Sequence, residues 1–185
     1  MSVFFLTGCR VSAVTRACVG HLETDGFGHL ETDGVDHYLN VTEKRNKKRR
    51  KILLDAARPV LAYVTQAGIK DYREGPLFRP MLPNGGGFER RHLDRKSPWR
   101  MVKKYCEVAG IDPSRLGSRG IGIPSLRKTA INDAIRNGAT MHEVREFAGH
   151  ADIRTTEVYF IRKKEDAEVA ARRIQIRLTG SLTNY

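Results

Sequence analysis

The sequence predicts an α+β fold that is mainly helical and contains a small antiparallel β-hairpin or sheet. Several segments, most of them in the second half of the chain, place apolar residues three and four positions apart, which is typical of amphipathic helices. Residues 37–54 differ, because β-forming residues alternate there around a polar turn. The length of 185 residues suits a single domain, 1–185.

Composition and charge narrow the class of protein. There are 33 lysines and arginines against 21 acidic residues, giving a net charge of +12, while 40% of residues are hydrophobic and 29% charged. This balance suits a soluble, foldable domain with a polyanionic partner, nucleic acid before an anionic membrane surface. No apolar run approaches the roughly 20 residues of a membrane span, so an integral membrane protein is excluded and we expect no membrane partner.

The cysteines and histidines do not indicate a metal site. Cys9, Cys18 and Cys106 form no CxxC pair, and the six histidines are scattered without zinc-ligand spacing. A sparse, odd number of cysteines suits a reducing cytosol, so we expect a cytoplasmic protein.

Two features mark the beginning of the chain. The chain opens in apolar sequence with no helix-start signal, as if it were entered partway through a core element. The apolar run, residues 3–6, is only four residues long and no basic residue precedes it, so it is too short for a signal peptide. Residues 20–26 recur identically at 28–34. Two copies cannot form a solenoid, and their Asp-Gly pairs indicate turns, so we interpret the repeat as a duplication within a surface loop.

The predicted hairpin is strongly basic. Residues 37–42 alternate as a strand does, a turn follows at 44–46, and a second strand ends in 52–54. Seven of the eight residues at 44–51 are lysine or arginine. A solvated edge that blocks aggregation is one explanation, but the charge of the whole chain favours phosphate contact. The hairpin residues we expect to contact the partner are Arg45, Lys47, Lys48, Arg49 and Arg50.

Two helices are predicted in the middle of the chain. One runs over 59–67 and is opened by Pro59, and another runs from Ser97 to Gly110. Loops rich in glycine, with proline in the first, are predicted at 76–87 and 117–122. The second helix should present one apolar stripe, made of Trp99, Val102, Tyr105, Cys106 and Ala109.

A further helix carries an arginine within its apolar stripe. The stripe consists of Leu126, Ala130, Ile131, Ala134 and Ile135, and Asn137-Gly138 ends it. Arg127 falls in the middle of this face. An inward-facing cation needs an anionic partner, which could be a bound phosphate or an internal carboxylate.

The last third of the chain contains three more helices. Thr140 and Glu143 form a capping box that opens a short helix, and Gly149 ends it, so His150 lies immediately past a helix end. Asp152 can cap the next helix, which contains Tyr159. Residues 162–178 form an amphipathic helix that could pack on its own core or on a partner.

Three segments together resemble the motifs of the tyrosine recombinases, the phage integrase family. TGCRVS at 7–12 is similar to the family's TGxRxSE box, and LRKTA at 126–130 to its second-arginine box, HxLRxTxAT. AGH at 148–150, followed by Thr155, Thr156 and Tyr159, resembles the LGHxxxxTTxxY box. The separations of 23 residues from Arg127 to His150 and nine from His150 to Tyr159 also agree with the family.

The resemblance implies a fold, an activity and a set of site residues. The fold would be the tyrosine recombinase catalytic fold, and the activity site-specific DNA recombination through a 3′-phosphotyrosyl intermediate. Tyr159 would be the nucleophile, and His150 would contact the same phosphate. The lysine general acid of the hairpin would be Lys44, with Lys47 and Lys48 as rivals. The two arginines that would hold the phosphate are Arg10 and Arg127, and Lys128 joins the DNA-contacting residues.

The resemblance also implies which partners the protein has. These are double-stranded DNA and further copies of the chain, assembled on DNA in a tetramer-like ring in which helix 162–178 docks on a neighbour. It implies no metal and no cofactor.

Three departures from the family pattern bear on activity. Pro124 stands where the family has a histidine three residues before the second arginine, and Ala13 stands where it has an acidic residue. Family members also carry more chain before the first arginine, so we expect a catalytic domain without its first part or the core-binding domain. The alternatives are a DNA-binding remnant without catalysis and a basic RNA-binding or architectural protein.

Overall fold

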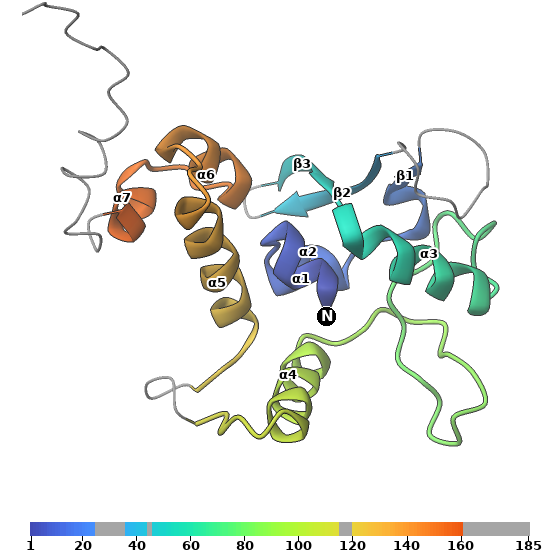
Figure 1. The fold of residues 1–185 in the computed structure, drawn as a ribbon. Helices are drawn as coiled ribbons and strands as arrows, with labels where there is room; N and C mark the ends of the chain where they lie inside the picture. Colours follow the sequence, from blue (N-terminus) through green and yellow to red (C-terminus); the bar gives the residue numbers. More distant parts are fainter. Residues whose placement is uncertain (25–35, 44–45, 115–119, 161–185) are drawn as a thin grey trace, which may run out of the picture.

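The computed structural model describes residues 1–24, 36–43, 46–114 and 120–160. The N-terminal half holds short helices and a sheet, and the C-terminal half is helical (Figure 1). The elements are α1 (Ser2–Thr7), α2 (Val11–Thr15), η1 (Val19–His21), β1 (Leu22–Thr24), β2 (His37–Glu43), β3 (Lys47–Ile52), η3 (Leu54–Ala56), α3 (Ala57–Gln66), α4 (Lys96–Val108), α5 (Ile123–Arg136), α6 (Met141–Ala148) and α7 (Arg154–Phe160). The prediction of a mainly helical α+β fold is confirmed.

The sheet has three antiparallel strands in the order β1-β2-β3. Leu39 pairs with Leu22 on one side and with Lys51 on the other. The predicted hairpin is therefore confirmed, but β1 was not predicted: it comes from the first copy of the repeat, which we had interpreted as loop. The second copy lies outside the described residues. The second predicted strand also ends earlier, at Ile52, because Leu54 adopts a positive φ of 45° and begins η3.

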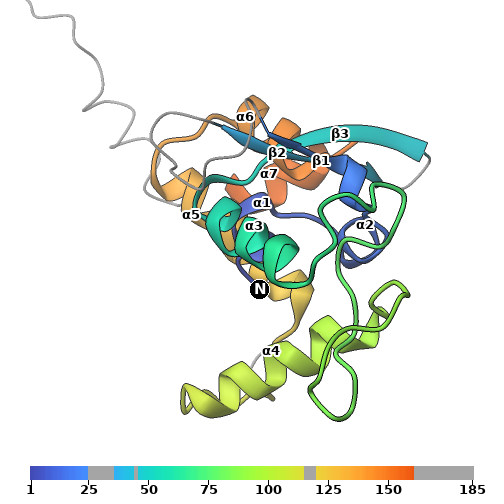
Figure 2. The ribbon, with the colours of Figure 1, turned by 90° about the vertical axis from the view of Figure 1, so that its right-hand side faces the viewer.

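Alternation along β2 decides which of its side chains face the core. Leu39 and Val41 are 1% and 2% exposed, whereas the residues between and beside them are more accessible. The sheet lies over α1 and α2, as the turned view shows (Figure 2). Odd-numbered residues from 37 to 43 and from 49 to 51 therefore point toward these helices, and even-numbered residues point away. Lys47 has the same register but is exposed at the start of β3.

Two clusters of buried side chains form the core. The larger joins α1, α2, the sheet, α3, α4 and the start of α5. The smaller is built on Ile131, Ile135, Val144 and Ala148, where α5 packs on α6, and Tyr159 and Phe160 of α7 lie against it. The site described below lies where these two parts of the fold meet.

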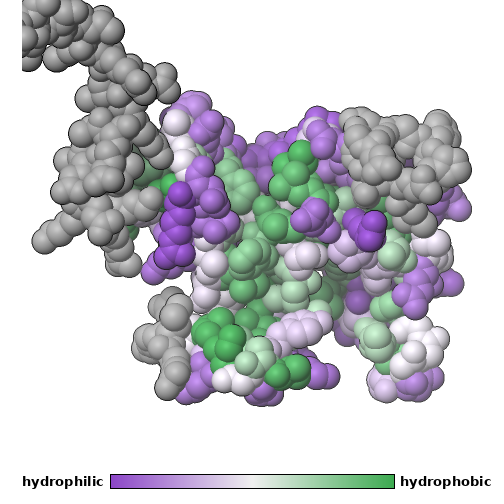
Figure 3. Space-filling model, viewed as in Figure 1, coloured by the Kyte–Doolittle hydropathy of each residue, from purple (hydrophilic) through white to green (hydrophobic). Residues whose placement is uncertain are grey.

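Helix α4 differs from its prediction. It starts at Lys96, where Asp94 accepts hydrogen bonds from the Ser97 amide (2.7 Å) and hydroxyl (2.9 Å). Of the expected apolar stripe only Val102 and Cys106 are buried, while Trp99 and Tyr105 are 43% and 58% exposed. Ala109 is exposed as well, so the predicted stripe was wrong for three of its five residues, because just one edge of α4 touches the core. Apolar side chains consequently gather on the surface over α4 (Figure 3).

The other helices agree with the predictions to within a few residues. Helix α3 begins at Ala57, two residues before Pro59. Thr140 caps α6 as expected: its hydroxyl accepts from the Glu143 amide at 3.2 Å, and its own amide donates to the Glu143 carboxylate at 2.7 Å. The predicted helix at 162–178 lies outside the described residues. Across the described part of the chain, no helix is long and apolar enough to cross a membrane.

Candidate active site

The first motif arginine follows the end of α1. Helix α1 stops at Gly8, whose φ of 59° is left-handed, and Arg10 then becomes the N-cap residue of α2. The Arg10 side chain is 38% exposed, and its Nη1 lies 2.7 Å from Oε2 of Glu43. Cys9 beside it is fully buried, and burial raises the pKa of its thiol, so Cys9 serves packing.

The second motif arginine bridges two helix ends. Arg127 Nη1 donates to the Gly8 carbonyl at the end of α1, and Nη2 donates to the Ala148 carbonyl at the end of α6. The last carbonyls of a helix lack partners within it and form the negative end of its dipole, so a cation is stabilised there. Burial and the charge of Arg10 lower the pKa of Arg127, but a guanidinium remains protonated. Backbone carbonyls thus hold Arg127, rather than the internal carboxylate considered above.

Three cationic side chains converge on the end of α6. The consecutive carbonyls of Glu146, Phe147 and Ala148 accept from Arg49 (3.5 Å), Lys51 and Arg127 respectively. Lys51 is only 6% exposed, and burial lowers its pKa. Helix α6 is therefore fixed at its C-terminus by β3 and α5, and this is the end that precedes His150.

His150 and Tyr159 form the remaining part of the site. Gly149 adopts a φ of 64°, which turns the chain so that the His150 amide donates to the Arg145 carbonyl at 3.1 Å. Nδ1 of His150 lies 3.0 Å from the Thr156 hydroxyl, and its ring stacks on that of Tyr159 at a centroid distance of 6.1 Å. Burial, followed by the charges of Arg127 and Arg10, lowers the pKa of His150, which favours a neutral imidazole.

Four of the predicted catalytic residues therefore come together from four parts of the chain. Arg10 and Arg127 are close enough to influence the titration of His150, and Tyr159 interacts electrostatically with Arg127. The fifth, Lys44, and the predicted DNA contact Arg45 lie outside the described residues.

The other predicted DNA contacts differ in how far the protein itself engages them. Lys47, Lys48 and Lys128 are exposed. Arg49 instead points inward, where it lies 3.3 Å from the Glu146 carboxylate and 3.8 Å from that of Glu43. Arg50 points outward but pairs with Glu23 at 2.7 Å and lies over the ring of Tyr38 at 3.4 Å. The basic ribbon is thus partly occupied by contacts within the protein.

Sequence reasoning missed Glu43 and Lys51. Both lie on the same face of the sheet as the buried Leu39 and Val41. Glu43 is two residues beyond Val41 in β2, and the register pairs Leu39 with Lys51 and Val41 with Arg49. Extending the alternation from Val41 by two residues reaches Glu43, and the register places Lys51 opposite Leu39, so both charged side chains fall on the inner face. The run of basic residues concealed this pattern, because charge suggested solvent throughout.

The two departures from the family motifs have clear structural positions. Pro124 is exposed in the first turn of α5, three residues before Arg127, and its ring offers neither a donor nor an acceptor. Ala13 is 2% exposed and belongs to the larger core cluster. Within the described ranges, no group of three or more His, Cys, Asp or Glu side chains could hold a metal ion.

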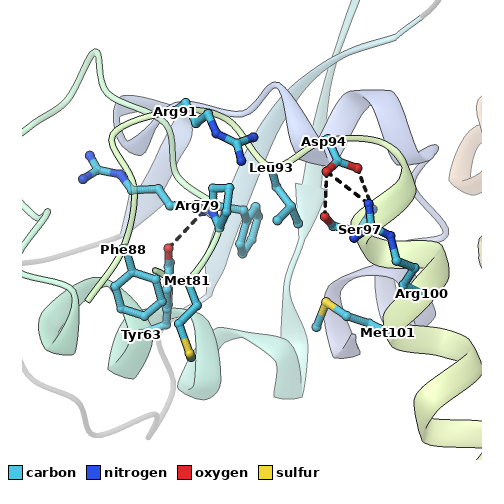
Figure 4. A pocket seen from close by; sticks show the side chains of 12 residues that line it. Tyr63, Arg79, Met81, Phe88, Arg91, Leu93, Asp94, Ser97, Arg100 and Met101 are labelled. Atoms are coloured by element: carbon cyan, nitrogen blue, oxygen red, sulfur yellow. Dashed lines mark hydrogen bonds and ion pairs between the residues drawn. The ribbon is translucent and has the colours of Figure 1, made fainter. Parts of the chain in front are cut away.

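A cavity of about 570 Å³ lies elsewhere, between α3, residues 76–94 and the start of α4. Tyr63, Phe88 and Met81 lie together on one side, and the Asp94–Ser97 hydrogen bonds close the other (Figure 4). None of the four convergent residues lines it, so it is separate from the candidate site.

Solved structures of tyrosine recombinases share this fold. The chain superposes on the crystal structure of XerA recombinase with a TM-score of 0.65 and 21% identity, over 95% of this chain and 55% of that one. It superposes on XerH site-specific recombinase, bound to the palindromic difH substrate in a post-cleavage complex, with a TM-score of 0.67 and 16% identity, over 93% and 44% of the two chains. The fold is thus that of the tyrosine recombinases.

Sequence comparison gives the family itself. The model of the phage integrase family matches residues 1–166, and the chain belongs to this family. Tyrosine recombinase XerD of Bifidobacterium longum (strain NCC 2705) is 28% identical over 164 residues, which cover 86% of this chain and 47% of that protein. XerD of Xanthomonas axonopodis pv. citri (strain 306) is 31% identical over 106 residues, 57% of this chain and 30% of that protein. The chain spans about half, or less, of the length of these relatives.

Proposed function

We propose that the chain is the catalytic part of a site-specific DNA recombinase that cleaves and rejoins DNA through a tyrosine nucleophile. The observation that supports this most directly is the convergence of Arg10, Arg127, His150 and Tyr159 from four separate segments. Membership of the phage integrase family supports the same conclusion. Partners and location follow: double-stranded DNA, further copies of the chain on that DNA, and the cytoplasm.

The proposed reaction needs neither a metal nor a cofactor. Tyr159 releases its proton to water, its Oη then attacks the phosphorus, a 3′-phosphotyrosyl bond forms, and the bond to the 5′-oxygen breaks. Lys44 supplies the proton to the leaving 5′-oxygen. Rejoining is the reverse reaction, with the 5′-hydroxyl of the new partner strand as the nucleophile.

The two arginines supply the positive charge that the transition state needs. A guanidinium has five N–H donors. Arg127 gives two of them to the carbonyls of Gly8 and Ala148, and Arg10 gives one to Glu43. The remaining donors are oriented by these contacts and free to bind the non-bridging phosphate oxygens, so the charge is organised before DNA arrives.

His150 acts as a neutral hydrogen-bond donor in this proposal. Its Nδ1 is held by the Thr156 hydroxyl. If that hydroxyl donates to Nδ1, the proton of the neutral ring lies on Nε2 and is directed to the phosphate. The stacking of the ring on Tyr159 places the donor beside the nucleophile.

A trapping experiment tests the proposal. The protein is mixed, in the presence of EDTA, with a pool of randomised DNA duplexes nicked so that the cleaved fragment diffuses away. We expect a covalent protein–DNA adduct on a denaturing gel that is absent for Tyr159→Phe. Salt-sensitive DNA binding without any adduct would contradict catalysis by this chain.

A DNA-binding remnant is the second candidate, and the exposed Pro124 favours it. The family histidine is missing there, and Pro124 supplies no polar group in its place. The variant Pro124→His separates the two candidates. An adduct formed by Pro124→His but not by the natural chain would identify this substitution as the cause of lost catalysis.

A further inference from the structure

We infer that Glu43 is a positioning residue for Arg10. It takes the place of the acidic residue that the family carries at position 13, where this chain has Ala13. This inference rests on the proposed function, since Arg10 is there one of the two phosphate-binding arginines. It assigns a role to a side chain that comes from the hairpin rather than from the arginine motif.

In the Arg10–Glu43 pair, the carboxylate is buried and the guanidinium is partly exposed. Glu43 is the last residue of β2 and points inward, and its side chain is 2% exposed. Its Oε2 lies 2.7 Å from Arg10 Nη1, whereas the Arg10 side chain remains 38% exposed. The carboxylate therefore binds Arg10 from the protein side and leaves its outer donors accessible.

This arrangement indicates that Glu43 orients Arg10 and does not compete with a DNA phosphate for it. A carboxylate that blocked the phosphate site would be exposed with Arg10 and would occupy two of its donors, as a phosphate does in a bidentate contact. Glu43 uses one donor of Arg10, and its second oxygen, Oε1, has no hydrogen-bond partner among the described residues. The contact thus restricts the rotation of Arg10 without occupying its outer side.

Position 13 cannot supply this carboxylate. Ala13 is 2% exposed within α2 and packs in the larger core cluster. Its methyl side chain offers no acceptor for Arg10. Glu43 reaches Arg10 from the sheet instead.

Glu43 also connects Arg10 to the rest of the site. Oε2 lies 3.8 Å from Arg49 Nε, and a Cβ added at Gly149 would stand only 2.7 Å from Oε2. The charge of Glu43 raises the pKa of His150, against the stronger effects that lower it. Lys44, the proposed proton donor, is the next residue along the chain.

The test compares Glu43→Gln with Glu43→Asp and with a matched control. Glu23→Gln is the control, since Glu23 also binds an arginine on this sheet, Arg50, at 2.7 Å but is 45% exposed. We expect Glu43→Gln to slow adduct formation in a single turnover by up to about 100-fold, the size expected for a misplaced catalytic group. The DNA affinity of Glu43→Gln should be unchanged or tighter. Glu43→Asp should form the adduct at an intermediate rate, and Glu23→Gln should form it at the rate of the natural chain.

Nuclear magnetic resonance gives a readout that does not depend on catalysis. The Arg10 guanidinium should show slow rotation in the natural chain and in Glu23→Gln, and fast rotation in Glu43→Gln. The pKa of His150 should fall in Glu43→Gln, because the nearby negative charge is gone. Circular dichroism and thermal melting confirm that each variant is folded.

The outcomes separate this inference from the proposed function. An adduct formed by Glu43→Gln at the natural rate, or a faster one, would overturn the positioning role. If the natural chain forms no adduct, the proposed function fails, and the rotation of Arg10 alone decides the inference. Unchanged Arg10 rotation in Glu43→Gln would then overturn it.

Discussion

The ammonium group of Lys51 donates a hydrogen bond to the carbonyl oxygen of Phe147, so that a lysine of β3 holds the last turn of α6. Arg49 and Arg127 bind the carbonyls on either side of Phe147. The Glu146 carbonyl also accepts from the Gly149 amide, whereas Lys51 and Arg127 bind the Phe147 and Ala148 carbonyls, so three cations fix this helix end. His150 lies two residues beyond Ala148, the last residue of α6. Its position therefore depends on contacts made by Arg49 and Lys51 of β3 and by Arg127 of α5.

The bridging role of Arg127 predicts a loss of stability in Arg127→Lys. An ammonium group can replace one of the two hydrogen bonds but lacks the planar fork that reaches both Gly8 and Ala148. A buried carbonyl left unpaired should reduce the free energy of unfolding by about 1–3 kcal/mol. Urea denaturation measures this, with the exposed neighbour Lys128→Arg expected within about 0.5 kcal/mol of the natural chain. Equal stability of both variants would contradict the bridge.

Two glycines with similar backbone angles should respond differently to alanine. Gly68 and Gly149 have φ of 61° and 64°, but a Cβ at Gly68 meets nothing within 4 Å, whereas one at Gly149 stands 2.7 Å from Glu43 Oε2 and 2.9 Å from Arg49 Nε. Gly68→Ala should cost about 1–2 kcal/mol through the left-handed backbone alone. Gly149→Ala should cost a further ~1–3 kcal/mol, because buried charged groups must move. Chemical denaturation of the two variants side by side tests this, and equal losses would refute it.

The environment of His150 predicts the direction of its titration. Burial and the charges of Arg127 and Arg10 hold its pKa below the ordinary value of about 6.5. Titration by nuclear magnetic resonance should show this, and Arg10→Gln should raise the pKa because one repelling cation is removed. A pKa that falls in Arg10→Gln would contradict the arrangement of charges.

The same shift has a consequence for stability against pH. Above about 6.5 the imidazole is neutral in both the folded and the unfolded chain, so no penalty arises. As the pH falls from there through the lower folded pKa, the unfolded chain binds the proton first, and the free energy of unfolding decreases. Denaturation series near neutral and acidic pH should therefore show a larger loss in the natural chain than in His150→Gln. A parallel loss in both would assign the acid sensitivity to other groups.

The exposure of each hairpin cation predicts how DNA binding depends on salt. Lys47 and Lys48 are exposed, so each should release about one counterion on binding a phosphate. Replacing both by alanine should reduce the slope of log K against log salt by about 0.9 per lysine. Fluorescence anisotropy at several salt concentrations measures the slope, with exposed Lys70→Ala, after α3, as the control. An unchanged slope would exclude these two lysines as phosphate contacts.

Local patterns were enough to predict much of this protein. The capping box of Thr140 and Glu143, the left-handed stop at Gly149 and the hairpin all follow from short-range chemistry, and the structure has them. The three motifs led to the family, because their residue types and separations are readable along the chain. The exposure of Trp99 and Tyr105 was not readable, since a helical stripe does not reveal how much of it a neighbour covers.

The partners of the charged residues were decided by the tertiary structure. Arg127 called for a negative partner, but two helix ends brought together by the fold supply it, and no local pattern specifies backbone carbonyls 119 and 21 residues away. Glu43 reaches Arg10 across 33 residues because the last residue of β2 lies over the start of α2. Interactions between residues close in sequence determine the helices, the strands and their ends. The charge around Arg10, Arg127 and His150 depends instead on which of those ends the packed core brings into contact.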